Sequence, residues 1–228
     1  MTARVWSCIA TTCARRRAKA AERQRRKLHT RLTQGEKAHR KRMATAAAVY
    51  TIAPFARTPE QTLQMLARAP VEPPLPPRPR PQEKRVWASL EQTPWEVLEE
   101  AFQDALDRDP HDDKRWVSVV DGNETQLAIL ATLADQHGRQ LTVILDIYHV
   151  MEYLWKAGHV FHPKGTPALE AWVLERLGRL LRGEASQVAA GMRRSATKRR
   201  LSPTERKAVD VCASYLLKYK HYLRYHEY

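Results

Sequence analysis

The sequence predicts an α/β protein whose carboxyl-terminal part is helical. Two short apolar runs rich in β-branched residues, 117–120 and 141–145, are each followed by an aspartate, Asp121 and Asp146. Over residues 84–162, strand-like and helix-like patterns alternate with short gaps between them. This alternation favours parallel strands joined by right-handed helical crossovers. An acid at the carboxyl end of such a strand lies where open α/β sheets place their chemistry.

Before this region the chain predicts a strand, a short helix and a spacer. Residues 49–52 (VYTI) favour a strand, although the alanines that precede them leave a helix open. Residues 58–61 (TPEQ) combine an N-cap, a first-turn proline and a capping-box partner, and predict a helix to about Ala69. Residues 70–81 hold seven of the 14 prolines and predict an extended spacer.

The alternating region then begins with a short strand over 84–90. A second capping signature at 93–96 (TPWE) begins a helix, and a third helix over 126–137 ends near Gly138. The strand that ends at Asp146 continues directly into a helix that reaches about residue 162.

Beyond residue 163 every pattern is helical. Thr166 and Pro167 begin a helix over 168–182, and residues 202–205 (SPTE) cap another that reaches about residue 218. Between the two lies a basic cluster that either contacts phosphate or is a solvated helix end. Its members are Arg193, Arg194, Lys198, Arg199 and Arg200.

The net charge of +14 is concentrated near the amino end. Residues 14–42 hold 13 Lys or Arg against two Glu, a net charge of +11. Such a block is typical of proteins that bind a polyanion, because Lys and Arg that neutralise phosphates release counterions. A solvated arm is the alternative. The basic residues expected to contact DNA here are Arg15, Arg16, Arg17, Arg25, Arg26, Lys27, Arg40, Lys41 and Arg42.

Composition excludes several classes of protein. The three cysteines show neither a disulfide framework nor paired metal-ligand spacing. No run reaches the roughly 18 apolar residues of a membrane-spanning helix, and the amino end lacks an apolar segment of the signal-peptide type. We therefore expect a reduced, cytoplasmic protein with no membrane partner. The absence of a Gly-rich phosphate loop argues against a nucleotide-binding protein.

Carboxylates at adjacent strand ends are able to share divalent cations. A pair of Mg²⁺ ions about 3.5–4 Å apart stabilises the attacking and leaving oxygens in phosphodiester chemistry, which normally needs at least three acids. From spacing alone, an Asp that caps the following turn or helix is the more common explanation. His159 and His162 are a weaker metal candidate, because no Cys or carboxylate is in register with them.

Longer stretches carry a more specific signal. They are KRMATAAAVYTIAPFARTPEQ, KRVWASLEQTPWEVLEEAF, WVSVVDGNETQL, LTVILDIYHVMEYLWKAGHVFHP, LEAWVLERLGRLLRGEASQVAAGMRRSAT and SYLLKYKHYLRYHEY. With these stretches the chain resembles, over residues 40–228, the ISKra-type transposases of bacterial insertion sequences. These are relatives of the mutator-like group and have an RNase H-like DDE domain.

The resemblance implies roles for three residues. Asp121 matches the second acid of the DDE triad, which binds Mg²⁺, and Asp146 and His149 match a D-x-x-H motif. Two roles stay open for that motif, orienting DNA and bracing the active site. A His one helical turn after an Asp can hydrogen-bond to it, and a partly buried structural histidine is the alternative. The implied partners are DNA (transposon ends and target), full-length transposase or a second copy, at the nucleoid.

Two acids of the triad are missing. The place of the first is filled by residues 1–13, which hold no Asp or Glu, and the third would follow residue 228. The resemblance thus implies an incomplete RNase H-like mixed sheet without its first strand, although residues 5–9 could form a poor strand. A truncated or frame-disrupted reading frame would explain both losses.

We expect three parts and one principal function. The parts are a basic arm (1–42), a partial RNase H-like domain (43–162) and a helical region truncated before the third acid (163–228). The favoured function is that of a transposase-derived protein without catalytic activity, because one acid cannot hold two metal ions. The alternative is a non-catalytic DNA-binding or transposition-inhibiting protein.

Overall fold

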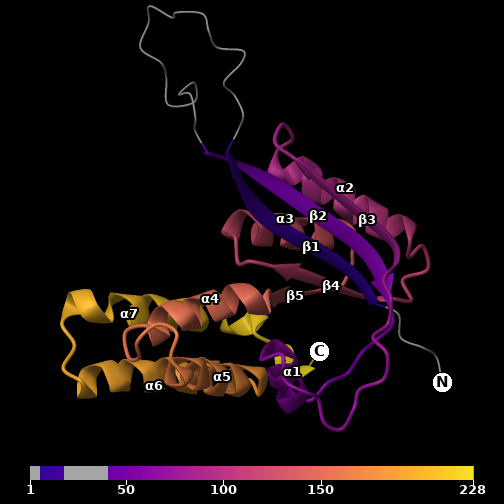
Figure 1. The fold of residues 1–228 in the computed structure, drawn as a ribbon. Helices are drawn as coiled ribbons and strands as arrows, with labels where there is room; N and C mark the ends of the chain where they lie inside the picture. Colours follow the sequence, from indigo (N-terminus) through magenta and orange to yellow (C-terminus); the bar gives the residue numbers. More distant parts are fainter. Residues whose placement is uncertain (1–5, 18–40, 228) are drawn as a thin grey trace, which may run out of the picture.

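A five-stranded mixed sheet organises the first two thirds of the chain (Figure 1). The structure is a computed structural model, and it describes residues 6–17 and 41–227. The strand order is β3-β2-β1-β4-β5, in which β1 pairs antiparallel with β2 and parallel with β4. The strands are β1 (Trp6–Arg17), β2 (Lys41–Ile52), β3 (Gln82–Ser89), β4 (Arg115–Val120) and β5 (Leu141–Leu145).

The central strand β1 corrects the expectation that the first strand is missing. It pairs with β2 from Trp6 to Arg17 and with β4 from Trp6 to Thr11. The expectation depended on the absence of an acid, whereas pairing depends on backbone groups and on residues that suit a sheet. The run WSCIATTC supplies aromatic, β-branched and small residues of that kind. Residues 41–52 are likewise a strand, and the helical alternative is wrong.

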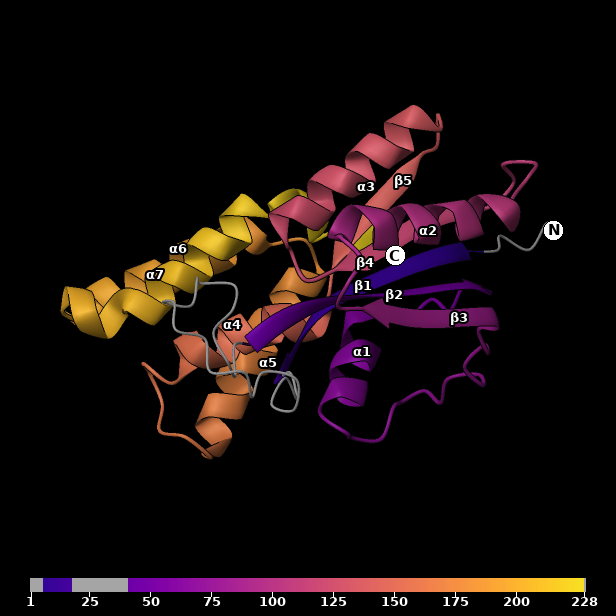
Figure 2. The ribbon, with the colours of Figure 1, turned by 90° about the horizontal axis from the view of Figure 1, so that it is seen from above.

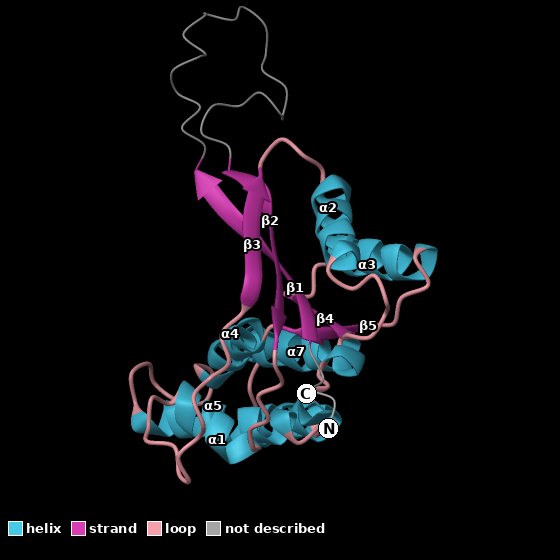
Figure 3. Cartoon of the chain, turned by 90° about the vertical axis from the view of Figure 1, so that its right-hand side faces the viewer, coloured by secondary structure: helices cyan, strands magenta, loops and turns pink. Residues whose placement is uncertain are grey.

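Helices α2 (Pro94–Asp107) and α3 (Glu124–Gln136) cover one face of the sheet (Figure 3). Helix α2 packs on β2 and on α3. Its buried face holds Val97, Leu98, Ala101, Phe102 and Ala105, and the last four follow the helical spacing of the sequence. The core of this half is therefore the layer between the sheet and α2.

The remaining helices form a separate layer that extends to one side of the sheet (Figure 2). Helix α4 packs on α5 and α7, and α6 packs on α7. Helix α1 joins this layer although it precedes β3, because Leu63 packs against α5 at Gly178 and Glu60 pairs with Arg182 at 3.0 Å. These helices are α1 (Pro59–Leu66), α4 (Ile147–Gly158), α5 (Pro167–Leu181), α6 (Ala185–Lys198) and α7 (Pro203–Lys218).

The capping patterns predict the starts of these helices correctly. Thr58, Thr93 and Ser202 each form a capping box, with the side chain and backbone of the third residue of the helix as partners. Thr166 accepts a hydrogen bond from Leu169 N and caps α5. The proline-rich residues 70–81 form the connection between α1 and β3, as expected for a spacer.

Gly158 sets the distance between α4 and α5. A Cβ at this position would lie 2.7 Å from Leu169 Cδ1 and 3.1 Å from a ring atom of Trp172. We expect Gly158→Ala to lower the free energy of unfolding by about 1 kcal/mol, because overpacking outweighs the better helix propensity of Ala. Chemical denaturation measures the change.

Gly191 provides the matched control for this substitution. It lies inside α6, and no atom comes within 4 Å of a Cβ built there. Gly191→Ala is therefore expected to raise the free energy of unfolding by about 0.5–1 kcal/mol. Equal effects of the two substitutions would show that close packing at Gly158 does not determine stability.

Candidate functional site

The two strand-end acids lie side by side at one edge of the sheet. Strands β4 and β5 are parallel neighbours, and their last pair is Val120 with Leu145. Asp121 and Asp146 follow directly, and Asp146 N donates a hydrogen bond to Val120 O at 2.7 Å. The structure therefore brings together the two acids that the sequence singles out.

Each carboxylate also organises the chain that follows it. Asp121 Oδ1 accepts a hydrogen bond from Asn123 N at 3.0 Å, and Asn123 in turn caps α3. Asp146 Oδ1 accepts from Tyr148 N at 3.0 Å and caps α4. Of the two roles that spacing alone suggests, Asp121 thus caps a turn and Asp146 caps a helix.

Two tyrosines from the carboxyl-terminal part reach the same edge of the sheet. The Tyr215 hydroxyl donates to the carbonyl oxygen of Asp121 at 3.5 Å, and the Tyr225 hydroxyl donates to that of Leu145 at 2.9 Å. Gly122 has φ +87°, and a Cβ there would lie 3.4 Å from the Tyr215 hydroxyl. The left-handed backbone favours glycine at this position, and Tyr215 packs directly beside it.

His149 belongs to an aromatic cluster between α4 and α7. Tyr153 and Tyr215 stack with ring centroids 4.0 Å apart, and His149 lies edge-on to both at 5.4 and 6.0 Å. Within the described residues no hydrogen bond joins His149 to Asp146, because the Asp146 carboxylate turns to the helix N–H groups. The hydrogen bond predicted within the D-x-x-H motif is therefore not formed, and His149 has the packing role that was the alternative.

The electrostatics of the cluster keep the tyrosine hydroxyls protonated. Burial raises the pKa of Tyr215, and the neighbouring Tyr153, Asp121 and Asp146 raise it further. Burial likewise raises the pKa of Tyr225, with Asp146 among the contributors. Both hydroxyls therefore remain hydrogen-bond donors to the strand ends at neutral pH.

The donor set around Asp121 does not fit the pair of Mg²⁺ ions that the resemblance implies. In the part of the chain that the structure describes, no group of three or more His, Cys, Asp or Glu could hold a metal ion. The parallel pairing of β1 with β4 ends with Thr11 opposite Val120. Continued by one position, this register places Thr12 next to Asp121. A pair of metal ions would need a second carboxylate at that position. His159 and His162 also lack a third ligand among the described residues.

Comparison of the chain with models of protein families, with curated proteins and with solved structures finds no match. None of the described helices is both long and apolar enough to cross a membrane. The geometry at Asp121 and the distribution of charge are therefore the observations that bear on the function of this chain.

One group of the predicted DNA-binding residues lies at the projecting end of the β1–β2 pair. Arg16 pairs with Arg42 and Arg17 with Lys41, at backbone positions where neither β3 nor β4 pairs with these strands. Figure 1 shows this end extending beyond the other strands. We call Arg15, Arg16, Arg17, Lys41 and Arg42 the ribbon end. Arg25, Arg26, Lys27 and Arg40 lie outside the described residues.

The expected boundary between a basic arm and the sheet, at residues 42 and 43, falls inside β2. Part of the basic block is therefore built into two strands. The arm prediction treated the charged residues as separate from the sheet, because runs of Arg and Lys carry no strand pattern of their own.

The second basic cluster divides into paired and unpaired side chains. Arg193 Nη2 donates to Ser214 Oγ at 2.9 Å, and its Nε lies 3.8 Å from Asp210. Arg199 Nη1 donates to the carbonyl oxygen of Phe161 at 2.9 Å. These two arginines thus hold the helices together, whereas Arg194, Lys198 and Arg200 are exposed.

Sequence reasoning missed Tyr215 and Tyr225 as residues of the site. Tyrosines recur every three or four residues at 215, 219, 222 and 225, and this helical spacing was the available signal, although α7 itself ends at Lys218. That spacing indicates a common face but does not reveal the strand ends that the face contacts. Tyr153, which stacks on Tyr215, is a packing residue.

Proposed function

We propose that the chain is a transposase-derived protein of a bacterial insertion sequence, with an RNase H-like fold, that binds DNA and does not cut it. The observation that carries the proposal is the sheet. A central first strand, antiparallel to β2 and parallel to β4, and an acid directly after β4 are features that the resemblance implies. They support the RNase H-like assignment.

The absence of cutting follows from the acids. Asp121 has no second carboxylate on β1, which holds no Asp or Glu over Trp6–Arg17. Two-metal phosphodiester chemistry needs carboxylates that hold both ions at once. Asp121 then has only its turn-forming role, and we assign it no catalytic step.

DNA binding is supported by the charge and shape of the ribbon end. A two-stranded ribbon is narrow enough to enter the major groove of DNA, and its five basic residues offer contacts to phosphates. Most of the affinity is expected to come from phosphates, so binding is expected to be weakly sequence-specific and steeply salt-dependent. A protein that binds DNA without cutting it would compete with full-length transposase for the same sites.

The test of the missing catalytic step uses the purified 228-residue protein, supercoiled plasmid and Mg²⁺. We expect no nicked product above a buffer control, and the same result for Asp121→Ala. Metal-dependent nicking that disappears in Asp121→Ala would overturn the proposal that the chain is inactive.

The test of binding measures affinity for duplex DNA by fluorescence anisotropy at several salt concentrations. We call the steepness with which the logarithm of the binding constant falls with the logarithm of salt concentration the salt slope. Replacing Arg16, Arg17, Lys41 and Arg42 by Gln is expected to reduce the salt slope by roughly 0.9 for each phosphate that the variant no longer neutralises. A slope that is unchanged in this variant would exclude the ribbon end as the DNA-binding surface.

A further inference from the structure

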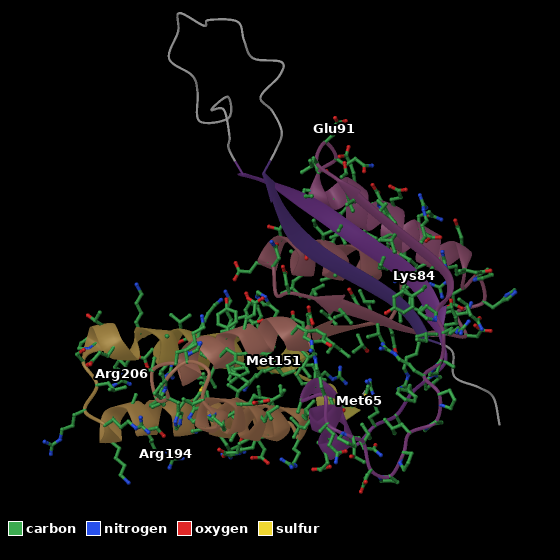
Figure 4. All side chains as sticks on the ribbon, viewed as in Figure 1. Met65, Lys84, Glu91, Met151, Arg194 and Arg206 are labelled. Atoms are coloured by element: carbon green, nitrogen blue, oxygen red, sulfur yellow. The ribbon has the colours of Figure 1, made fainter. Side chains whose placement is uncertain are left out.

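The turn between α6 and α7 is the second concentration of positive charge in the chain. Residues 185–211 hold seven Lys or Arg and only two acids, Glu205 and Asp210. Figure 1 shows this turn at the end of the helical layer, far from the ribbon end. Figure 4 places Arg194 and Arg206 at the same end of the molecule.

Both acids in this segment are already engaged. Asp210 accepts hydrogen bonds from Arg206 at 2.8 and 3.2 Å, and Arg193 lies 3.8 Å away. Glu205 accepts from the Ser202 backbone N–H at 2.8 Å and from its hydroxyl at 2.6 Å. These hydrogen bonds lower the pKa of Glu205, which stays ionised in its capping box.

Four basic side chains remain after this pairing. All four are exposed, and they make no hydrogen bond or ion pair with any residue in the described ranges 6–17 and 41–227. We call them the helical basic end: Arg194, Lys198, Arg200 and Lys207. Their charges are not balanced by the fold, so this end of the molecule attracts anions.

The backbone of Arg200 has a left-handed conformation, which glycine adopts most easily. Its φ is +53°, directly after the C-cap Arg199 of α6. Arg200 N donates to Thr197 O at 2.9 Å and Leu201 N to Ala196 O at 3.2 Å, which closes the helix. Glycine is the favoured residue at such a position, because a side chain strains the left-handed backbone.

From this combination we infer that the helical basic end is a second surface that contacts the phosphates of duplex DNA, separate from the ribbon end. Four flexible cations at the end of the helical layer suit a repeating polyanion better than a small anion, which needs converging groups. The inference rests on the proposed function for its ligand. It adds a second place at which one molecule holds DNA.

The decisive variant is Arg200→Gly, because it removes one charge and relieves the backbone strain. Arg68 gives a matched control: it is also exposed, has φ +56° after the C-cap of α1, and lies outside the helical basic end. Arg68 N and Ala69 N close α1 with the same pattern of hydrogen bonds, to Met65 O and Gln64 O. The two substitutions therefore make the same local change at different places on the surface.

The measurement is anisotropy with a labelled duplex over a range of salt concentrations, with thermal unfolding of each variant beside it. We expect Arg200→Gly to reduce the salt slope by roughly 0.9 and to unfold at the same or a higher temperature. Arg68→Gly is expected to keep the wild-type slope. Changing all four residues, with Gly at 200 and Gln at 194, 198 and 207, should reduce the slope by roughly 3–4.

Four outcomes would overturn the inference in distinguishable ways. Equal slopes for wild type and the fourfold variant would remove the second surface but leave DNA binding by the ribbon end in place. Equal reductions of the slope in Arg68→Gly and Arg200→Gly would show a general effect of net charge. If the fourfold variant loses binding to vesicles of anionic lipid but keeps its slope with DNA, the surface binds membranes instead. Absence of DNA binding by wild type would overturn the proposed function as well.

Discussion

Replacing Asp109 by Ala is expected to lower the free energy of unfolding by about 3 kcal/mol. Asp109 is fully buried between the end of α2 and the start of β4. Its carboxylate accepts hydrogen bonds from Trp116 Nε1 at 2.8 Å, Asp113 N at 3.1 Å and Lys114 N at 3.4 Å. Truncation leaves these donors without an acceptor, and a buried unsatisfied donor costs about 1–3 kcal/mol.

Chemical denaturation of Asp109→Ala measures this effect, and Asp107→Ala is its control. Asp107 ends α2 on the exposed side, where it accepts a hydrogen bond from Gln103. Its replacement is expected to change the free energy of unfolding by less than about 0.5 kcal/mol. Similar losses of unfolding free energy at the two positions would mean that the burial of Asp109 and its hydrogen bond with Trp116 do not stabilise the fold.

The same carboxylate predicts how stability responds to acid. Burial raises the pKa of Asp109, but the hydrogen bonds from Trp116, Asp113 and Lys114 outweigh this and hold the pKa below its usual value. A group with a lowered folded-state pKa stabilises the fold above its unfolded-state pKa, which is about 3.9 for Asp, and loses this contribution as the pH falls further. The stability difference between wild type and Asp109→Asn should therefore shrink below about pH 4. A difference that stays constant from about pH 6 to about pH 3 would contradict this.

Truncating Tyr215 to Ala is expected to lower the free energy of unfolding by about 3–5 kcal/mol, as for other large buried aromatic residues. The side chain is 8% exposed, stacks on Tyr153 and contacts Tyr219 with centroids 5.0 Å apart. Its removal opens a cavity between α4 and α7 beside the turn at Gly122. The loss is measured by denaturation and by the near-ultraviolet circular dichroism of the tyrosine cluster.

Tyr215→Phe separates the ring from the hydroxyl. It keeps the stack but removes the hydrogen bond to Asp121 O, which at 3.5 Å is long. The expected cost is only about 0.5 kcal/mol. A cost as large as that of Tyr215→Ala would show that the hydroxyl, and not the ring, joins the helical layer to the strand end.

The parts of the fold that could be predicted are those encoded by neighbouring residues. The capping boxes at Thr58, Thr93 and Ser202 depend on groups three residues apart, and the acids after β4 and β5 follow recognisable apolar runs. β1 was expected to be missing or at most a poor strand over residues 5–9, because its pairing with β2 and β4 over Trp6–Arg17 depends on residues far along the chain. A partly buried structural role for His149 was one of two open alternatives, but its partner Tyr215 was not identified, since it lies 66 positions later.

The two tyrosine hydrogen bonds at the strand ends also concern the order of folding. Tyr215 reaches Asp121 across 94 residues and Tyr225 reaches Leu145 across 80 residues. Contacts of such long sequence separation close late and slow the folding reaction. During synthesis, the hydrogen bonds at the ends of β4 and β5 cannot form before the last helical segment has been made. Until then, the backbone oxygens at both strand ends lack these partners, and we expect the incomplete chain to be more prone to misfolding than the finished one.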